Sequence, residues 1–398
     1  MTPSNDYPLD DLRSRPSYGE RSGSCSSTAR MLLLVGLLTP PAAGAVSGAT
    51  TGIGTTSGEV LYQRACAACH GADGRGMPRE TVGFATPLPD FTDCRFGPRE
   101  PDADWYAVAH AGGPVRGFDR MMPAFGKALS ETQLTAILGH VRTFCRSDAW
   151  PRGELNLPRA LVTEKAFPED ELVVTTSTTD GDARSSQMEI VYEKRFGPRN
   201  QIEVAVPVSS IESGRPDGSL RTDNGVGDVG VAFKRALFHS HQRGAIFSLT
   251  GEVILPTGNE GRGLGRGYTV FEPFATFGKI LPADAFLQFQ AGFELPIDEA
   301  AAEDEAFLRG VFGTSWSATP FGRTWSPMLE LLAKRELASG EDVLWDAVPQ
   351  VQVTLNTRQH VMANFGVRLP LNRTQGRDTE LLFYILWDWF DGGFLQGW

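Results

Sequence analysis

Two cysteines and a histidine stand close together in the segment Cys66-Ala67-Ala68-Cys69-His70. C-x-x-C-H is the attachment signature of c-type haem. Each thiol adds to a vinyl group of the haem and forms a thioether, and the adjacent histidine reaches the iron as an axial ligand. A bare C-x-x-C also occurs in redox dithiols and in half of a zinc site, but the histidine that follows at once favours haem. The sequence therefore predicts one covalently attached haem c.

A sixth ligand for the iron is expected from the segment Met121-Met122-Pro123. A thioether ligand raises the haem potential and leaves the iron without an open position. Because proline restricts the residue before it to an extended conformation, Met122 is the candidate. The alternatives are Met121 as the ligand, both methionines as packing residues, or a second histidine, His110 or His140.

Three helices are expected to position these residues. The first spans Ser57–Ala68 and ends at the haem motif, and the second spans Asp102–Ala111. The last begins at Ser130, where Ser130-x-x-Gln133 is a capping-box pattern. Its apolar stripe, which should pack on the first helix, consists of Leu134, Ile137, Leu138 and Val141.

With these features, residues 55–146 resemble a class I mono-haem cytochrome c. The resemblance rests on a helix, the C-x-x-C-H motif, a Met-Pro loop and a terminal helix, and it covers about a quarter of the chain. It implies an all-α domain, placed at 52–147, that transfers one electron. It also implies Cys66 and Cys69 as attachment sites, His70 as proximal ligand and Met122 as distal ligand.

The remaining cysteines and the N-terminus point to export. Residues 1–45 are predicted to be a targeting segment, because a short apolar core at 31–38 follows Arg30 and precedes the small residues at 43–45. In an oxidising compartment Cys94 and Cys145 form an even pair, so we expect a disulfide between them. The alternative is two buried free thiols.

Composition excludes some partners. The chain has 398 residues and a formal net charge of −11, which argues against binding to nucleic acid and to anionic lipid. No apolar run reaches the 18 residues that a spanning helix needs.

A linker is expected at 148–158, and beyond it the apolar pattern changes to a period of two. In 287–295, for example, Leu, Phe, Ala, Phe and Leu alternate with Gln, Gln, Gly and Glu. Twelve such strands can be placed, joined by connections that are alternately short and long, as in outer-membrane barrels. The sequence therefore predicts an antiparallel transmembrane β-barrel of about 12 strands at 159–398. A soluble β-sandwich is the alternative, since it shows the same alternation.

Two segments of this region, 224–230 (NGVGDVG) and 255–258 (LPTG), resemble motifs of the outer-membrane barrels grouped as the "MetA pathway of phenol degradation" family. The resemblance implies a barrel and passage of a small solute, and it supplies no catalytic residue. Asp228 is read as a turn residue, with a lumen or rim charge as the alternative. Glu203, Glu252 and Glu294 are expected in the lumen, one per strand, as polar lining.

Together these patterns predict an outer-membrane anchored cytochrome in the bacterial cell envelope. Its haem domain would lie in the periplasm and exchange electrons with periplasmic redox proteins, while outer-membrane lipid surrounds the barrel. We expect an electron carrier rather than a catalyst with its own substrate. The alternatives are a fused cytochrome–porin that oxidises an external donor such as ferrous iron, and a channel for a small solute or metal ion with a tethered redox domain.

Overall fold

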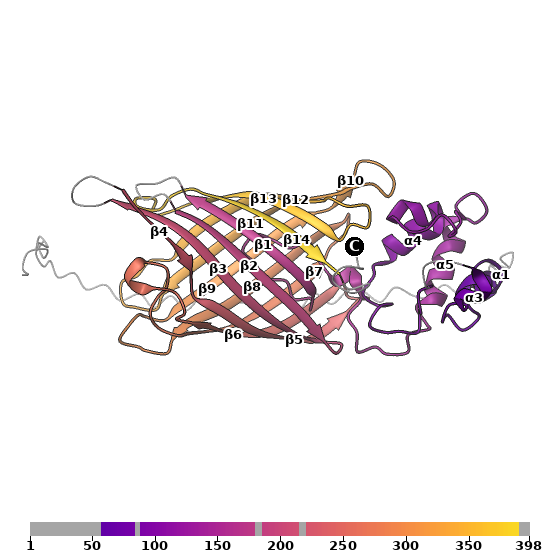
Figure 1. Ribbon diagram of the computed structural model, residues 1–398, viewed down its shortest axis with the longest axis horizontal. Coiled ribbons are helices and arrows are strands. Elements are labelled where there is room, and N and C mark those ends of the chain that lie inside the picture. Colours follow the sequence, from indigo (N-terminus) through magenta and orange to yellow (C-terminus); the bar gives the residue numbers. More distant parts are fainter. Residues whose placement is uncertain (1–56, 84–87, 180–184, 215–219, 390–398) are drawn as a thin grey trace, which may run out of the picture. The chain divides into compact units, whose positions relative to one another are not determined.

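The computed structural model describes residues 57–83, 88–179, 185–214 and 220–389 (Figure 1). The expected targeting segment, 1–45, lies outside these residues. From Gly54 onward the chain forms one compact unit. Its helical elements are α1 (Gly58–Ala65), α2 (Ala67–His70), α3 (Arg79–Val82), α4 (Asp102–Ala111), η1 (Gly113–Arg116), α5 (Glu131–Val141), η2 (Gly153–Leu155) and η3 (Glu260–Arg262). Among the described helices, none combines the length and the apolar character needed to cross a membrane.

The helical part is held together by α1 and α5. The Ser57 side chain caps α1 by accepting a hydrogen bond from the Val60 N–H, and Ser130 and Gln133 form the expected capping box at the start of α5. The apolar faces of both helices meet in one cluster, which buries Leu61, Tyr62, Ile137 and Val141. Local signals in the sequence therefore place both helices that frame the haem motif.

The second part of the chain consists of strands. They are β1 (Asp170–Thr179), β2 (Ser185–Phe196), β3 (Asn200–Gly214), β4 (Leu220–Val226), β5 (Val229–Ser240), β6 (Ala245–Leu255), β7 (Val270–Ile280), β8 (Ala285–Pro296), β9 (Glu305–Thr314), β10 (Trp316–Ser317), β11 (Thr324–Glu336), β12 (Leu344–Thr354), β13 (Val361–Pro370) and β14 (Glu380–Asp388). All neighbours pair antiparallel.

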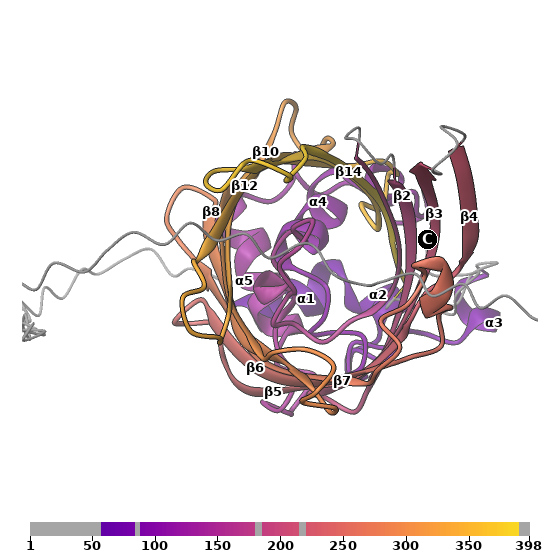
Figure 2. The ribbon, with the colours of Figure 1, turned by 90° about the vertical axis from the view of Figure 1, so that its left-hand side faces the viewer.

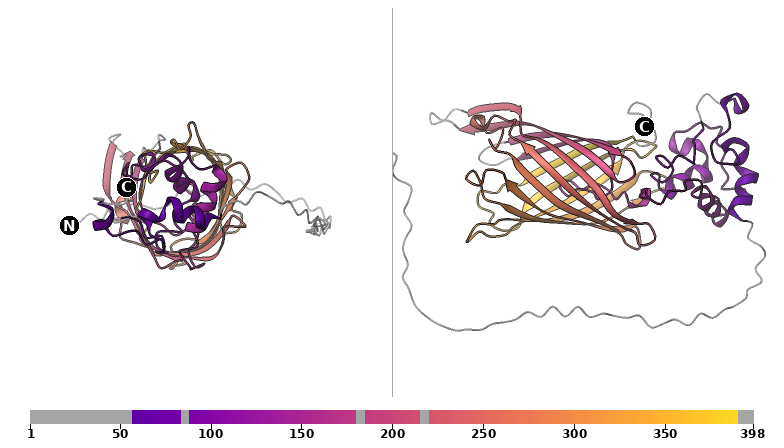
Figure 3. Two further views of the ribbon diagram at one scale, coloured as in Figure 1. Left: turned by 90° about the vertical axis from the view of Figure 1, so that its right-hand side faces the viewer. Right: turned by 90° about the horizontal axis from the view of Figure 1, so that it is seen from below.

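The strands close into a barrel with a wall of 12 strands (Figure 3). β4 pairs only with β3, and β10 pairs only with β11, so these two lie off the wall. The ring is completed by pairing of β14 with β1 and of β9 with β11. Figure 2, which looks along the barrel, shows β4 outside the ring. The prediction of a 12-stranded antiparallel barrel is confirmed.

The wall is apolar outside and polar inside. On β8, Phe289 is 44% exposed, whereas its neighbours Gln288 and Gln290 are 2% and 1% exposed. A soluble sandwich buries its apolar side chains and exposes its polar ones, so this arrangement is the reverse. It is the arrangement of a barrel whose outer face meets lipid.

The stretch expected as a linker, 148–158, makes close contacts. Its second half is packed: Gly153, Leu155 and Leu157 are buried. The Gly153 N–H donates to the Pro98 carbonyl at 2.8 Å, and a Cβ at Gly153 would lie 1.9 Å from the Arg99 carbonyl oxygen. The glycine therefore allows a close approach of two backbones that a linker does not need.

The chain then continues as a non-regular segment, residues 156–169, which we call the lumen segment. Inward-facing side chains of the barrel bind its backbone. The Tyr384 hydroxyl donates to the Arg159 carbonyl at 2.7 Å, and the Thr163 N–H donates to Glu330 at 2.7 Å. Further bonds join it to Gln201, Gln288, Gln290 and Gln350. Because these six partners lie on five different strands, β3, β8, β11, β12 and β14, the segment crosses the inside of the barrel.

Candidate functional site

The haem motif is built by one helical turn. Cys66 ends α1, and its carbonyl accepts the N–H groups of Cys69 and His70 at 3.1 and 2.9 Å. Residues at i, i+3 and i+4 share one face of such a turn. The local backbone therefore directs both thiols and the imidazole to the same side, as attachment to one macrocycle requires.

Cys66 lacks the lowered thiol pKa that is typical of a redox dithiol. Both are free thiols and half-buried. Burial, and after it the neighbouring Cys69, raises the pKa of the Cys66 thiol to about 11. Reactive C-x-x-C thiols have a lowered pKa, because the thiolate is the nucleophile. A motif that keeps its thiol protonated is a poor redox dithiol and is compatible with thioether attachment.

His70 is suited to bind a metal. Burial lowers the pKa of its imidazole to about 4, so the ring is neutral at pH 7, the form that coordinates iron. The ring stacks on Phe91 with centroids 5.0 Å apart, and Phe91 contacts Trp105. Among the described residues the His70 Nδ1 atom is buried without a hydrogen-bond partner. An unsatisfied polar atom beside two free thiols fits a haem group at this position.

The loop that carries Met122 is held by backbone contacts. The Gly113 N–H donates to the Met122 carbonyl at 3.0 Å. Gly112 has a positive φ of 86°, and a Cβ there would lie 3.0 Å from the same carbonyl oxygen, so glycine is needed at this turn. The Met122 side chain is half-buried, whereas Met121 is 56% exposed. Within the described residues no contact joins Met122 to His70, and the ligand role of Met122 stays a prediction.

The two alternative histidines pack in aromatic clusters. His110 stacks on Tyr106 with centroids 5.7 Å apart, and His140 lies 5.3 Å from Tyr62. This packing agrees with the interpretation of both as packed helix residues. Each ring nevertheless has one buried nitrogen, His110 Nδ1 and His140 Nε2, without a hydrogen-bond partner among the described residues.

Cys94 and Cys145 are joined by a disulfide, with Cα atoms 5.2 Å apart. The bridge ties the loop before α4 to the residues just after α5.

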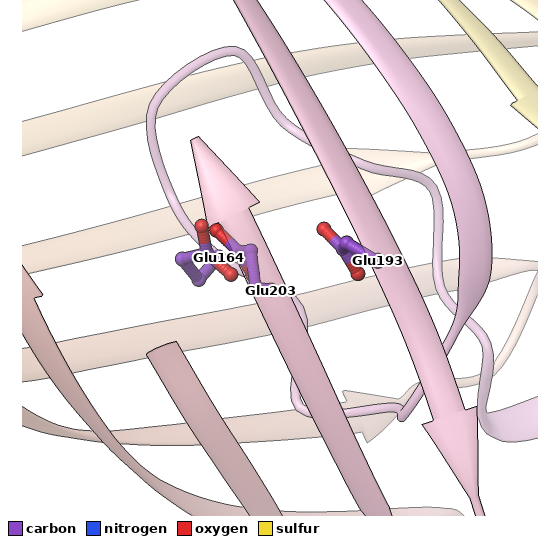
Figure 4. Close-up of side chains that lie close together, drawn as sticks. All are labelled: Glu164, Glu193 and Glu203. Atoms are coloured by element: carbon purple, nitrogen blue, oxygen red, sulfur yellow. The ribbon is translucent and has the colours of Figure 1, made fainter. Parts of the chain in front are cut away.

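The barrel contains a cluster of charged side chains, which the sequence did not predict. Arg159 of the lumen segment donates to Glu171 at 2.7 Å and to Glu193 at 2.6 Å, and both carboxylates are fully buried. Lys234 binds Glu164 at 3.1 Å. Figure 4 shows Glu164 of the segment beside Glu193 on β2 and Glu203 on β3. Carboxylate oxygens of these three glutamates lie within 4.8 Å of one another.

These contacts favour an internal ion-pair network over a metal centre. Arg159 and Lys234 already engage Glu164 and Glu193, and Gln201 donates to Glu193 at 2.7 Å. The network fastens the lumen segment to the wall. The sequence predicted Glu203 as polar lining of the lumen. It did not predict that Arg159 and Glu164 would contact the same cluster. Their segment has no strand periodicity, so nothing in its pattern indicated a position inside the barrel.

Asp228 has a structural role. One of its carboxylate oxygens accepts the Gly258 N–H at 2.9 Å, and the other accepts the Arg266 N–H at 2.7 Å. It therefore fixes the connection between β6 and β7, which includes η3, rather than lining the lumen. The position of Asp228 agrees better with the predicted turn residue than with the alternative, a charged residue at the rim of the barrel.

Comparison with known proteins supports the helical part as a cytochrome c domain. Residues 54–141 match the protein family described as "Cytochrome C oxidase, cbb3-type, subunit III". This match implies a haem cofactor. No curated protein matches the chain.

Solved structures with a similar arrangement include outer-membrane channels. The COG4313 outer membrane channel from Pseudomonas putida F1 is 13% identical, with 58% of this chain and 98% of that chain covered and a TM-score of 0.42. The KdgM porin is 9% identical over 55% and 98% of the two chains, with a TM-score of 0.37. The NanC porin is 11% identical over 55% and 98%, with a TM-score of 0.36. Likenesses at this level carry no argument about function, and none of them confirms the resemblance to the "MetA pathway of phenol degradation" family.

Proposed function

We propose that the chain is an outer-membrane anchored c-type cytochrome that transfers single electrons on the periplasmic side. The observation that carries this proposal is the haem motif itself. Cys66, Cys69 and His70 lie on one face of a helical turn, with two free thiols and a half-buried, neutral imidazole. A covalently attached haem supplies a one-electron couple at that position.

The chain's own residues would hold this group and tune it. Cys66 and Cys69 would anchor it by thioethers, and His70 would be its proximal ligand. Met122 would be the distal ligand, on a loop whose backbone is fixed at Gly113. Phe91 packs on the His70 ring and limits access of water to it. If Met122 as well as His70 held the iron, no position would remain open for a substrate, which favours a carrier over an oxidase.

In this proposal the barrel is the anchor. Its outer face presents large apolar side chains to lipid, for example Phe233, Phe289 and Phe312, which are 45%, 44% and 54% exposed. The lumen segment, fastened from several sides, argues against a wide aqueous pore. A channel with a tethered redox domain is therefore the weaker candidate. The expected partners are soluble redox proteins of the periplasm.

The proposal is tested on the full-length protein purified from membranes. We expect haem-dependent staining of the denatured band, a reversible one-electron titration and a low-spin spectrum with a methionine-to-iron charge-transfer band. The double variant Cys66→Ala/Cys69→Ala should lose covalent haem completely. Met122→Ala should lose the charge-transfer band and lower the midpoint potential by on the order of 0.1 V, well within the range that axial ligands set.

Met121→Ala is the matched control, since it removes the exposed neighbour, and it should leave the spectrum unchanged. A wild-type spectrum with a high-spin iron, or loss of the charge-transfer band in Met121→Ala, would contradict the assigned ligand. Absence of covalent haem from the wild-type protein would overturn the proposed function.

A further inference from the structure

Acidic side chains form a row along the inside of the barrel, interrupted at Ala232. Strand pairing places Asp388 opposite Glu171, Glu171 opposite Glu193, and Glu193 opposite Glu203. Ala232 follows on β5, and then comes the directly paired couple Glu252 and Glu272. Farther along, Glu294 pairs with Glu305, and Glu305 with Glu336. We call this set the acidic row.

Like charges that face each other across two strands destabilise a sheet. A row of this kind therefore needs compensation along its length. At the end of the row that begins with Asp388, basic residues of the lumen segment compensate the negative charge. Arg159 binds Glu171 and Glu193, and Lys165 binds Glu171 at 3.1 Å.

Basic side chains of the barrel itself compensate the other end. Arg266 binds Glu294 at 2.8 Å, and Lys334 binds Glu305 at 3.0 Å. Both ends of the row are thus occupied by cationic groups that belong to the protein.

The middle of the row differs. Within the described part of the chain, no lysine or arginine forms an ion pair with Glu252 or Glu272. Two basic side chains of the lumen, Lys234 and Arg309, are engaged with other partners. Lys234 binds Glu164, and Arg309 donates to the Val162 carbonyl and to Gln290 at 3.2 Å each.

The Glu252 side chain lies against the neighbouring strand β5. A Cβ at Gly230 would lie 2.1 Å from the Glu252 Oε1 atom. The Glu252 carboxylate therefore lies over a position without a side chain, next to Ala232 on the same strand. The glycine on β5 therefore accommodates the Glu252 carboxylate, which a larger side chain would displace.

A buried hydroxyl supplies a second, independent sign of a ligand. Thr250 lies two residues before Glu252 on β6, so strand alternation directs it to the same lumen face. It is 5% exposed, and its Oγ1 atom has no hydrogen-bond partner among the described residues. Buried hydroxyl groups are normally satisfied, so an unpartnered one on the same strand face as an uncompensated carboxylate couple fits a bound species in this part of the lumen.

We propose that Glu252 and Glu272 bind a hard divalent cation in the lumen, with the Thr250 hydroxyl completing an all-oxygen site. Carboxylate and hydroxyl oxygens suit calcium, magnesium and manganese rather than soft metals. Such an ion would provide positive charge in the middle of the acidic row, as Arg159 and Lys334 do at its two ends. This inference does not rest on the proposed electron transfer.

The test uses the full-length haem-containing protein in detergent, treated with a chelator and then titrated with Mn²⁺ at pH 7. Loss of the paramagnetic resonance signal of free Mn²⁺ reports binding. We expect one saturable site, which Ca²⁺ competes for. Glu252→Gln and Glu272→Gln, which keep the size of the side chain, should each weaken binding at least about tenfold, or roughly 1.4 kcal/mol.

Glu305→Gln is the matched control, because this carboxylate belongs to the same row but already has Lys334 as a partner. Its affinity should stay within about threefold of the wild type, which corresponds to less than 1 kcal/mol. Heat-dependent gel mobility confirms that each variant retains a folded barrel. If Glu252→Gln fails to fold, Glu272→Gln and Thr250→Val answer the same question.

Two results would overturn the proposal. One is the absence of saturable Mn²⁺ binding to the wild-type protein, which would mean that the carboxyl couple is neutralised by a proton instead. The other is equal loss of binding in Glu305→Gln, which would place the ion elsewhere in the row.

Discussion

The haem motif and the charged cluster in the barrel lumen differ in how their residues come together. The motif uses Cys66, Cys69 and His70, which neighbour one another along the chain and meet within a single helical turn. In the lumen, Arg159 meets Glu193 across 34 positions, and its carbonyl meets the Tyr384 hydroxyl across 225. The first arrangement exists wherever a short helix forms, whereas the second exists only when the barrel is closed.

This difference implies that each region can be damaged without the other. A change in the lumen should cost stability of the barrel and leave the haem environment intact. A change around the helices should do the reverse.

The largest effect is expected for Arg159→Ala. The change leaves two fully buried carboxylates, Glu171 and Glu193, without their shared partner. Breaking a buried ion pair in this way costs about 3–5 kcal/mol. We expect the denaturant midpoint of the barrel, followed by heat-dependent gel mobility, to fall accordingly, while the haem absorption spectrum stays the same.

Lys334→Ala serves as control for that variant. Its ion pair with Glu305 is exposed, with 45% of the lysine side chain accessible, so its removal should cost less than about 1 kcal/mol. Equal losses in Arg159→Ala and Lys334→Ala would contradict the view that the lumen segment is fastened by buried charge.

A smaller effect, confined to the helical part, is expected for Cys94→Ala/Cys145→Ala. The bridge closes a chain separation of 51 residues, so its loss should destabilise the helices by roughly 2–4 kcal/mol. Haem absorbance during denaturation reports this shift, and barrel gel mobility should not move. If the two transitions shift together, the helical part and the barrel unfold as one unit and the proposed independence is wrong.

The smallest effect is expected for Asp228→Asn. Asp228 accepts two backbone N–H groups, from Gly258 and Arg266, and bonds to a charged acceptor are stronger than bonds to a neutral one. The variant should lose about 1–2 kcal/mol. Limited proteolysis between β6 and β7 should accelerate, whereas Asp298→Asn, whose bond stays within its own loop, should not differ from wild type.

Sequence patterns predicted those parts of the structure that depend mainly on residues close together in the chain. The capping box at Ser130 and Gln133 and the stripe from Leu134 to Val141 located α5. Alternation in 287–295 located β8 and its two faces, since neighbouring side chains of a strand must point in opposite directions. The pairing of Cys94 with Cys145 followed from counting cysteines and matches the bridge in the structure.

The sequence did not predict contacts between residues that lie far apart in the chain. Residues 156–169 have no strand or helix period, so they were divided between an expected linker and the start of the barrel. Their position depends on acceptors such as Glu330 and Gln350, which come much later in the chain. Likewise, Glu203, Glu252 and Glu294 were assigned to the lumen singly, because a register between strands cannot be read from one strand.

The sequence by itself determined the haem motif, the helices that frame it and the number of strands in the barrel wall. These depend on spacing within a few residues, which the backbone converts directly into a shared face. Only the tertiary structure decided that a charged segment enters the lumen and that scattered carboxylates line up in one row. Closure of the barrel and the stagger of its strands bring these groups together, and burial then makes each unpaired charge costly.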